Sequence, residues 1–138
     1  MADLNGQGEL YKKTICELFA GVGDFRLGFD RLDSGWRTTW FSQWEPGAET
    51  QWAYDCYVQH YEYSVDLNGE YHTKEDISSM EKNAIPNHIL LVGGFPCQGY
   101  SVVYTLASSK GIEGKKGVLW WQIRDTLIAK KAPILPLV

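Results

Sequence analysis

Short apolar runs alternate along this chain with segments that have helical spacing. Four apolar runs are typical of buried parallel strands: residues 12–19, 37–44, 88–92 and 132–138. Three segments have the apolar spacing of an amphipathic helix: residues 24–32, 47–60 and 117–131. Strands that alternate with helices predict an α/β fold with a doubly wound, Rossmann-like parallel sheet, of which residues 132–138 begin the fifth strand.

The same spacing predicts which side chains of each helix face the core. In the first helix, which Gly35 ends, four residues are expected to point partly inward: Phe25, Leu27, Phe29 and Leu32. In the second helix, Ala48, Trp52 and Cys56 fall on one face, so Cys56 is expected in the core. In the third helix, Leu119, Ile123 and Leu127 are in register.

The remaining segments are expected to be irregular. Residues 1–10 are polar and are expected to form a disordered tail, which leaves residues 11–138 as one domain or part of one. Residues 62–71 are loop-like, and a short strand is expected just before Asp76. The region 102–116 is long for a loop inside a compact domain, and such loops are often lids or binding loops.

Composition places the chain among soluble globular proteins, with 44% hydrophobic and 22% charged residues. No apolar run approaches the ~20 residues that span a bilayer, so no membrane association is expected. Three cysteines with no CxxC or histidine pairing predict neither a disulfide framework nor a metal site. A reducing, cytoplasmic compartment is therefore expected.

The net charge of −4 is unevenly distributed. Residues 1–102 carry 7 basic and 15 acidic side chains, whereas residues 103–138 carry 6 basic and 2 acidic ones. Basic residues near the end of a helix are one explanation of the second set. The other is that this segment faces a phosphate backbone.

A glycine turn, Ala20-Gly21-Val22-Gly23, joins the first strand to the first helix. A turn of this kind lets a ligand approach the backbone, although a tight turn alone explains it equally well. Glu45 follows the second strand, at about the spacing from the turn at which an acidic residue binds ribose hydroxyls, unless it simply faces solvent. Arg26 replaces the third glycine of the dinucleotide fingerprint, which favours a cofactor without a pyrophosphate.

Cys97 lies one residue beyond the point where the strand at 88–92 gives way to Gly93-Gly94-Phe95-Pro96. Reactive groups of open α/β sheets gather at the carboxyl ends of strands. A free cysteine near neutral pH is only about a few per cent thiolate, and a lone cysteine is commonly an inert small hydrophobe. The glycines and proline beside Cys97 favour a nucleophile.

Together these motifs resemble the DNA (cytosine-5)-methyltransferase family from Thr14 onward. The resemblance implies S-adenosylmethionine as cofactor and a DNA-modifying enzyme of the restriction–modification type. By this resemblance the cofactor-binding residues are Phe19, Ala20, Gly21, Val22, Gly23, Glu45, Asp76, Ile77, Pro96 and Leu119. Cys97 is implied as the catalytic residue, and the implied substrate-binding residues are Gln98, Ser101, Lys110 and Lys116. Asp76 is also a candidate helix N-cap.

The chemistry implied by this family begins with the addition of the Cys97 thiolate to carbon 6 of a cytosine that has been flipped out of double-stranded DNA. The resulting enamine lets carbon 5 attack the sulfonium methyl. The family's Glu-Asn-Val motif, its later arginine motifs and its target-recognition domain have no counterpart in residues 1–138. The chain alone is therefore expected to be inactive, as a fragment or as one half of a split enzyme that needs a complementary subunit or C-terminal half.

Other functions remain open at this point. Cytosine in tRNA is an alternative substrate for the same nucleophile. A non-catalytic cofactor-binding or assembly module is a second alternative, and a nicotinamide-dependent oxidoreductase is a distant one. Because the fifth strand is incomplete, the strand at 88–92 is expected to leave an apolar edge open, which predicts a dimer or aggregate.

Overall fold

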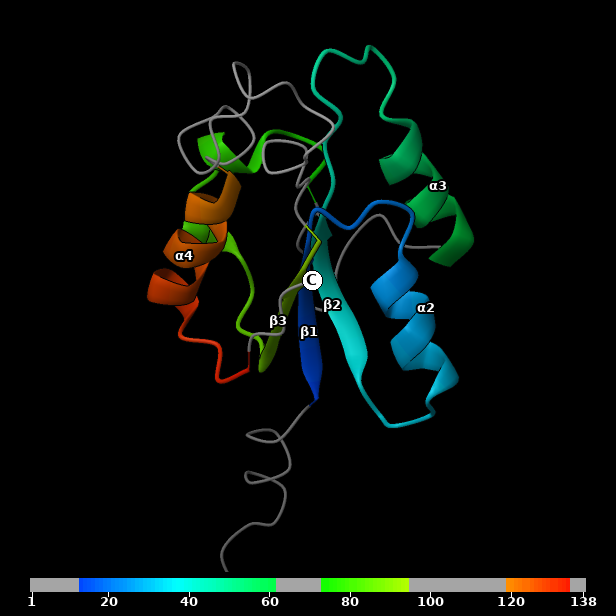
Figure 1. The fold of residues 1–138 in the computed structure, drawn as a ribbon, viewed down its shortest axis with the longest axis vertical. Helices are drawn as coiled ribbons and strands as arrows, with labels where there is room; N and C mark the ends of the chain where they lie inside the picture. The colour runs from blue at the N-terminus through cyan, green and yellow to red at the C-terminus, as the bar shows by residue number, and fades with distance from the viewer. Residues whose placement is uncertain (1–12, 62–72, 95–118, 135–138) are drawn as a thin grey trace, which may run out of the picture.

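The computed structural model describes residues 13–61, 73–94 and 119–134. Its three strands are β1 (Thr14–Leu18), β2 (Arg37–Ser42) and β3 (Leu90–Gly93). They form a parallel sheet in the order β2-β1-β3 (Figure 1). The helices are α2 (Asp24–Arg31), α3 (Trp52–Tyr61) and α4 (Leu119–Lys130), with short 3₁₀ turns η1 (Ile77–Ser79) and η2 (Lys82–Ala84).

β1 is the central strand of the sheet, and its side chains alternate between two cores. Cys16 and Leu18 pack beneath α4 with Ile123, whereas Ile15 packs with Phe25 and Phe29 of α2. Figure 1 shows α4 on one face of the sheet and α2 with α3 on the other. Helices on both faces of a parallel sheet confirm the predicted doubly wound, Rossmann-like architecture.

Single bridges extend the sheet at both edges. Ser42 pairs in parallel with Thr73, where a short strand before Asp76 is predicted. Leu90 pairs in parallel with Ile134, at the start of the predicted fifth strand. The Leu91 N–H donates to the Ile134 carbonyl at 3.0 Å, so the outer edge of β3 is paired at that point. Residues 135–138 lie outside the described part of the chain.

α3 departs from the sequence-based prediction, which is wrong about its inward face. It begins at Trp52, and Ala48, Trp52 and Cys56 are all exposed, Trp52 to 72%. The buried face instead carries aromatic rings. Tyr57 stacks on Phe41 of β2 at a centroid distance of 3.7 Å, and Tyr54, Val58 and Tyr61 pack around this pair. The aromatic partner Phe41 on β2 decides which face is buried, and the i, i+4 spacing of Ala48, Trp52 and Cys56 does not.

α2 agrees with the predicted segment, and its inward face is narrower than predicted. Phe25 and Phe29 are partly buried against Ile15, Leu90 and Val92, as expected. Leu27 and Leu32 are exposed, which contradicts the prediction. The helix ends at Arg31, and Asp33 and Gly35 adopt left-handed conformations in the turn to β2. Phe25 and Phe29 are therefore the apolar side chains of α2 that pack against the sheet.

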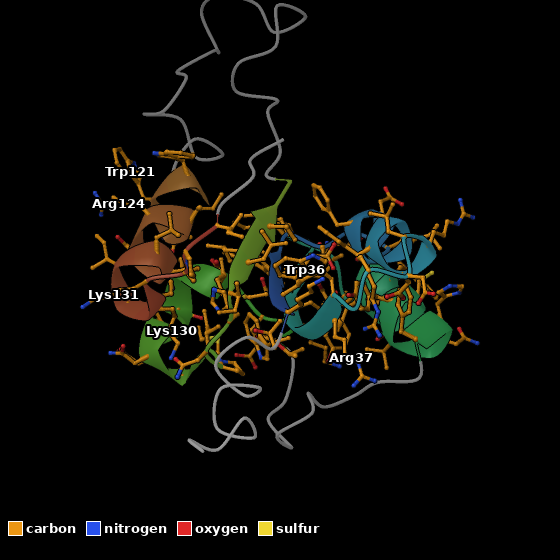
Figure 2. The ribbon with its side chains drawn as sticks, turned by 90° about the horizontal axis from the view of Figure 1, so that it is seen from below. Trp36, Arg37, Trp121, Arg124, Lys130 and Lys131 are labelled. Carbon is orange, nitrogen blue, oxygen red and sulfur yellow. The ribbon has the colours of Figure 1, made fainter. Side chains whose placement is uncertain are left out.

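α4 packs on the sheet through Ile123, which is 1% exposed. Figure 2 shows Trp121, Arg124 and Lys131 on the side of α4 that faces away from the sheet. The Arg124 guanidinium lies 4.6 Å from the centre of the Trp121 ring and bonds Asp125 at 2.7 Å. Lys130 and Lys131 lie at the C-terminal end of the helix, where cations are favourable. Among the helices that the structure describes, none has the length and apolar character that a membrane crossing requires.

Candidate cofactor and active site

The connections that follow β1 and β2 are bonded to each other at the carboxyl edge of the sheet. The Ala20 N–H donates to the Ser42 carbonyl at 3.0 Å, and the Gly21 N–H donates to Oε1 of Gln43 at 2.8 Å. The Gln43 N–H in turn donates to the Thr73 carbonyl at 3.0 Å. Three separate segments of the chain are thereby held together at one end of the sheet.

The glycine turn after β1 has a backbone that most residues avoid. Phe19, Gly21 and Gly23 have φ values of 55°, 58° and 95°. The Gly23 N–H closes the turn on the Ala20 carbonyl at 3.0 Å. A Cβ atom placed on Gly21 would meet no atom of the described residues within 4 Å, and Val22 is 50% exposed. The turn therefore presents its backbone to open space, as a ligand-binding turn must.

Gly23 has a second reason to be glycine. A Cβ atom at this position would lie 2.8 Å from the Tyr61 ring and 2.9 Å from the Tyr57 ring. The Tyr61 hydroxyl also donates to the Gly23 carbonyl at 3.2 Å. Packing against α3 thus accounts for Gly23, whereas at Gly21 the φ of 58° is what favours glycine.

Glu45 lies three residues after β2 and is held by residues at the start of α3. Its backbone N–H and carbonyl bond the side-chain amide of Gln51 at 2.6 Å and 3.0 Å. Its Oε2 accepts a hydrogen bond from the Ala53 N–H at 3.2 Å. A carboxylate at a helix N-terminus is favourable, so Glu45 is ordered by α3 at the edge where the glycine turn lies.

Asp76 is the N-cap of η1, which confirms the prediction that this residue caps a helix. Its Oδ1 accepts a hydrogen bond from the Ser78 N–H at 2.9 Å. Ile77 is 4% exposed and packs in the core with Leu18 and Trp40. The Ile77 side chain therefore cannot touch a ligand at the surface, which leaves its backbone as the part able to contact a cofactor.

The segment that leads to Cys97 leaves the sheet beside the glycine turn. Leu18 and Gly93, the last residues of β1 and β3, are paired in register. The glycine turn begins at Ala20, two residues after Leu18, and Cys97 comes four residues after Gly93. Pro96, Cys97, Gln98, Ser101, Lys110 and Lys116 lie outside the described residues. Leu119 is the first residue of α4.

Glu17 is a fully buried carboxyl group that motif matching alone did not assign a role. Its Oε2 accepts a hydrogen bond from the Tyr57 hydroxyl at 2.9 Å. Burial raises the pKa of Glu17 to about 7, against the lowering effects of the Tyr57 hydrogen bond and the Arg26 charge. Burial also raises the pKa of Tyr57, and the Glu17 charge adds to this. Glu17 therefore titrates close to neutral pH beneath the turn.

Sequence reasoning also missed Gln43, Gln51 and Tyr57. Gln43 bonds the Gly21 N–H, Gln51 bonds the Glu45 backbone, and Tyr57 packs against Gly23. The available signal for Tyr57 was the spacing of Tyr54, Tyr57 and Tyr61, a stripe at helical intervals. Glutamine side chains that bond distant backbone groups leave no comparable pattern. The described parts of the chain contain no cluster of three or more His, Cys, Asp or Glu side chains that could hold a metal ion.

Comparison with known proteins agrees with this arrangement. A model of the C-5 cytosine-specific DNA methylase family matches residues 13–137. The chain is 44% identical over 115 residues to the type II methyltransferase M.Sau3AI of Staphylococcus aureus, a match that covers 81% of this chain and 26% of that protein. It is 32% identical over 119 residues to the type II methyltransferase M.HaeII of Haemophilus aegyptius, covering 86% of this chain and 31% of that protein.

A third relative, the type II methyltransferase M.HhaI of Haemophilus parahaemolyticus, is 28% identical over 119 residues, covering 86% of this chain and 31% of that protein. The chain spans only about a quarter to a third of the length of these relatives. The family match, in contrast, covers nearly the whole chain. The chain therefore belongs to the C-5 cytosine-specific DNA methylase family.

Proposed function

We propose that this chain methylates carbon 5 of cytosine in DNA together with further protein. It would supply the nucleophile and the glycine turn, which binds the cofactor and is called the cofactor turn below. The observation that carries the proposal is the Leu18–Gly93 register. It starts two connections side by side, one forming the glycine turn and the other leading to Cys97. A cofactor at the first and a base at the second would then lie next to each other.

The residues at this edge fit S-adenosylmethionine. Gly21 faces open space and would let the methionine part of the cofactor approach the backbone. Glu45 would accept hydrogen bonds from the ribose hydroxyls, and Asp76 with the Ile77 backbone would bind the adenine edge. The sulfonium of S-adenosylmethionine supplies an electrophilic methyl group.

Cys97 would act as the covalent nucleophile toward the cytosine ring. Its thiolate adds to carbon 6, which makes carbon 5 nucleophilic enough to take the methyl group. Loss of the proton from carbon 5 then expels the thiolate and restores the aromatic ring. Because the ring must be reached from its face, the base has to leave the duplex first.

Gln98, Ser101, Lys110 and Lys116 would contact the DNA substrate. The two lysines would neutralise phosphates and help to hold the extruded nucleotide in place. Because the chain covers 26% of M.Sau3AI, we propose that residues 1–138 alone bind cofactor without turnover and need further protein, covalently joined or in trans.

Calorimetric titration of the chain with S-adenosylmethionine tests the first part of this proposal. We expect saturable binding that Glu45→Ala weakens and that Glu49→Ala, a change at an exposed neighbour, leaves unchanged. Absence of binding at any concentration, or equal binding by both variants, would contradict the cofactor assignment.

Methyl transfer tests the second part. The chain is joined to the remainder of M.Sau3AI and incubated with labelled cofactor and either DNA or tRNA. We expect label in DNA cytosine, a covalent complex on DNA that contains 5-fluorocytosine, and loss of both in Cys97→Ser. Transfer to tRNA in preference to DNA would favour the alternative substrate, and transfer by Cys97→Ser would exclude Cys97 as nucleophile.

A further inference from the structure

A buried hydrogen bond beneath the cofactor turn links β1 to α3, and the proposed reaction does not use it. Glu17 and Tyr57 are each 0% exposed, and the Tyr57 hydroxyl donates to Oε2 of Glu17 at 2.9 Å. The other carboxyl oxygen, Oε1, is buried and has no hydrogen-bond partner among the described residues. A buried carboxyl group with a single donor is costly, so this contact needs an explanation.

The ring of Tyr57 lies beside Gly23 of the cofactor turn. It stacks on Phe41 of β2, and with the Tyr61 ring it fills the space beside Gly23 that a Cβ atom would need. The Tyr61 hydroxyl bonds the Gly23 carbonyl at 3.2 Å. A displacement of α3 would therefore displace Gly23 as well, because close-packed rings cannot move independently of the backbone that they contact.

The charges that face Glu17 come from α2, while α3 contributes only the phenolic hydroxyl. The Arg26 guanidinium favours the ionised carboxyl group, whereas Asp24 and Asp30 oppose it. Arg26 lies 4.1 Å from the centre of the Tyr61 ring, so it also contacts the tyrosine that bonds Gly23. Phe41, on the neighbouring strand β2, carries no charge. Burial raises the pKa of Glu17 most, and Arg26, one of the groups that lower it, contacts the tyrosine that bonds the turn.

We propose that Tyr57 and Glu17 are positioning residues for the cofactor turn: the Tyr57–Glu17 hydrogen bond sets how firmly α3 holds Gly23, and ionisation of Glu17 strengthens that hold. The physical reason is that a hydroxyl binds an ionised carboxylate more strongly than a neutral acid, so this one contact tightens even though burying the charge lowers the stability of the whole fold. A negative charge beneath the turn also favours a cationic ligand. S-adenosylmethionine should therefore bind more tightly when Glu17 is ionised, a last step that rests on the proposed cofactor site.

The first experiment follows the Gly23 backbone amide by NMR in the ligand-free chain between pH 5 and pH 9. In the wild type we expect its resonance to shift with the same midpoint as the Glu17 carboxyl carbon. The Tyr57 hydrogen bond favours ionisation, so Tyr57→Phe should move both midpoints to higher pH. Glu17→Gln should remove the step at Gly23. Tyr54→Phe, a matched change on the same helix, should leave the midpoint where it is.

The second experiment measures the dissociation constant of S-adenosylmethionine over the same pH range. We expect Tyr57→Phe to weaken binding about tenfold at neutral pH, the effect of one hydrogen bond to a charged group. The pH at which affinity changes should rise together with the Glu17 midpoint. Glu17→Gln should make affinity independent of pH in this range, and Tyr54→Phe should behave as wild type.

The outcomes separate this inference from the proposed function. If the Gly23 amide does not titrate with Glu17, or if Tyr57→Phe keeps the wild-type midpoint, Tyr57 only fills space and the inference is wrong. If the amide behaves as expected and no S-adenosylmethionine binds at any pH, the link between Glu17 and the turn stands and the cofactor assignment fails. Because Tyr57→Phe keeps the ring and its stacking on Phe41, loss of folding in Glu17→Gln would leave the Tyr57 comparison decisive.

Discussion

Ser42 and Thr73 form a parallel bridge at the carboxyl edge of the sheet. Each is followed, three residues later, by an acidic residue that is proposed to bind the cofactor. Glu45 follows Ser42, and Asp76 follows Thr73. The same edge is tied to the glycine turn, because the Ser42 carbonyl accepts a hydrogen bond from the Ala20 N–H. One small region of backbone pairing thus gathers the glycine turn, Glu45 and Asp76 from three distant parts of the sequence.

Gly23 provides the sharpest test of the packing behind the turn. Gly23→Ala forces a φ of 95° on a residue with a Cβ atom and places that atom within 3 Å of two tyrosine rings. We expect a loss of about 2 kcal/mol or more in the free energy of unfolding, measured by urea denaturation.

Gly28→Ala is the matched control for this change. Gly28 lies in α2, is exposed, and has open space where a Cβ atom would be added. Alanine favours a helix over glycine, so we expect Gly28→Ala to stabilise the chain by about 0.5–1 kcal/mol. A Gly23→Ala variant as stable as wild type would show that α3 does not hold the turn.

The strands and α2 could be predicted because their signals are local. Apolar runs that stop at glycine marked β1 and β3, and the glycine turn fixed the start of α2 at Asp24. The position of Glu45 followed from the end of β2. These features depend on residues near each other in the sequence, so a single chain is enough to show them.

The inward face of α3 was predicted wrongly, because the spacing of its tyrosines is a weak signal and contacts between distant residues decide which face is buried. Its tyrosines carry hydroxyls and are as common at surfaces as in cores. What buries Tyr57 is its stacking on Phe41 together with the bond to Glu17, 40 residues earlier in the chain. Likewise, the side chain of Ile77 lies in the core, although the family motif suggests only that this position touches the cofactor.

Gln51 should matter more than its place in a polar loop suggests. Its amide bonds the backbone of Glu45 on both sides, at 2.6 Å and 3.0 Å, and so closes residues 45–51 ahead of α3. Gln51→Ala should lower the free energy of unfolding by about 1–2 kcal/mol and weaken the affinity for S-adenosylmethionine.

Gln59→Ala is the control, because Gln59 is exposed on α3. We expect its effect on unfolding to stay within about 0.5 kcal/mol and its affinity to equal that of wild type. Equal behaviour of the two glutamine variants in urea denaturation and calorimetry would mean that Gln51 does not order Glu45.

α4 offers a matched pair of isoleucines that tests how the helix is seated. Ile123 is 1% exposed and would contact a Cβ atom at Gly93 at 3.7 Å, whereas Ile128 is 66% exposed. Ile123→Ala should cost about 2–5 kcal/mol in the free energy of unfolding, and Ile128→Ala less than about 0.5 kcal/mol. Similar losses in urea denaturation would mean that α4 packs through a different face.

The buried carboxyl group of Glu17 should make the stability of the chain depend on pH. Its pKa is raised by burial from 4.5 to about 7 in the folded state. Between these values the folded chain holds a proton that the unfolded chain releases, so the free energy of unfolding falls as pH rises through this window. A pKa difference of this size corresponds to about 3 kcal/mol of stabilisation, which is lost in full above about pH 7.

Glu17→Gln removes the titrating group, so the fall in stability between pH 5 and pH 8 should be smaller in this variant by about that amount. Urea denaturation at several pH values measures both curves, and their difference isolates Glu17 from the other ionisable groups. Glu49→Gln changes an exposed carboxyl group and should keep the wild-type curve. Parallel curves for wild type and Glu17→Gln would show that Glu17 is ionised throughout this range. In that case Tyr57 and Arg26 stabilise the charge fully, and the turn is held with the same strength at every pH in the range.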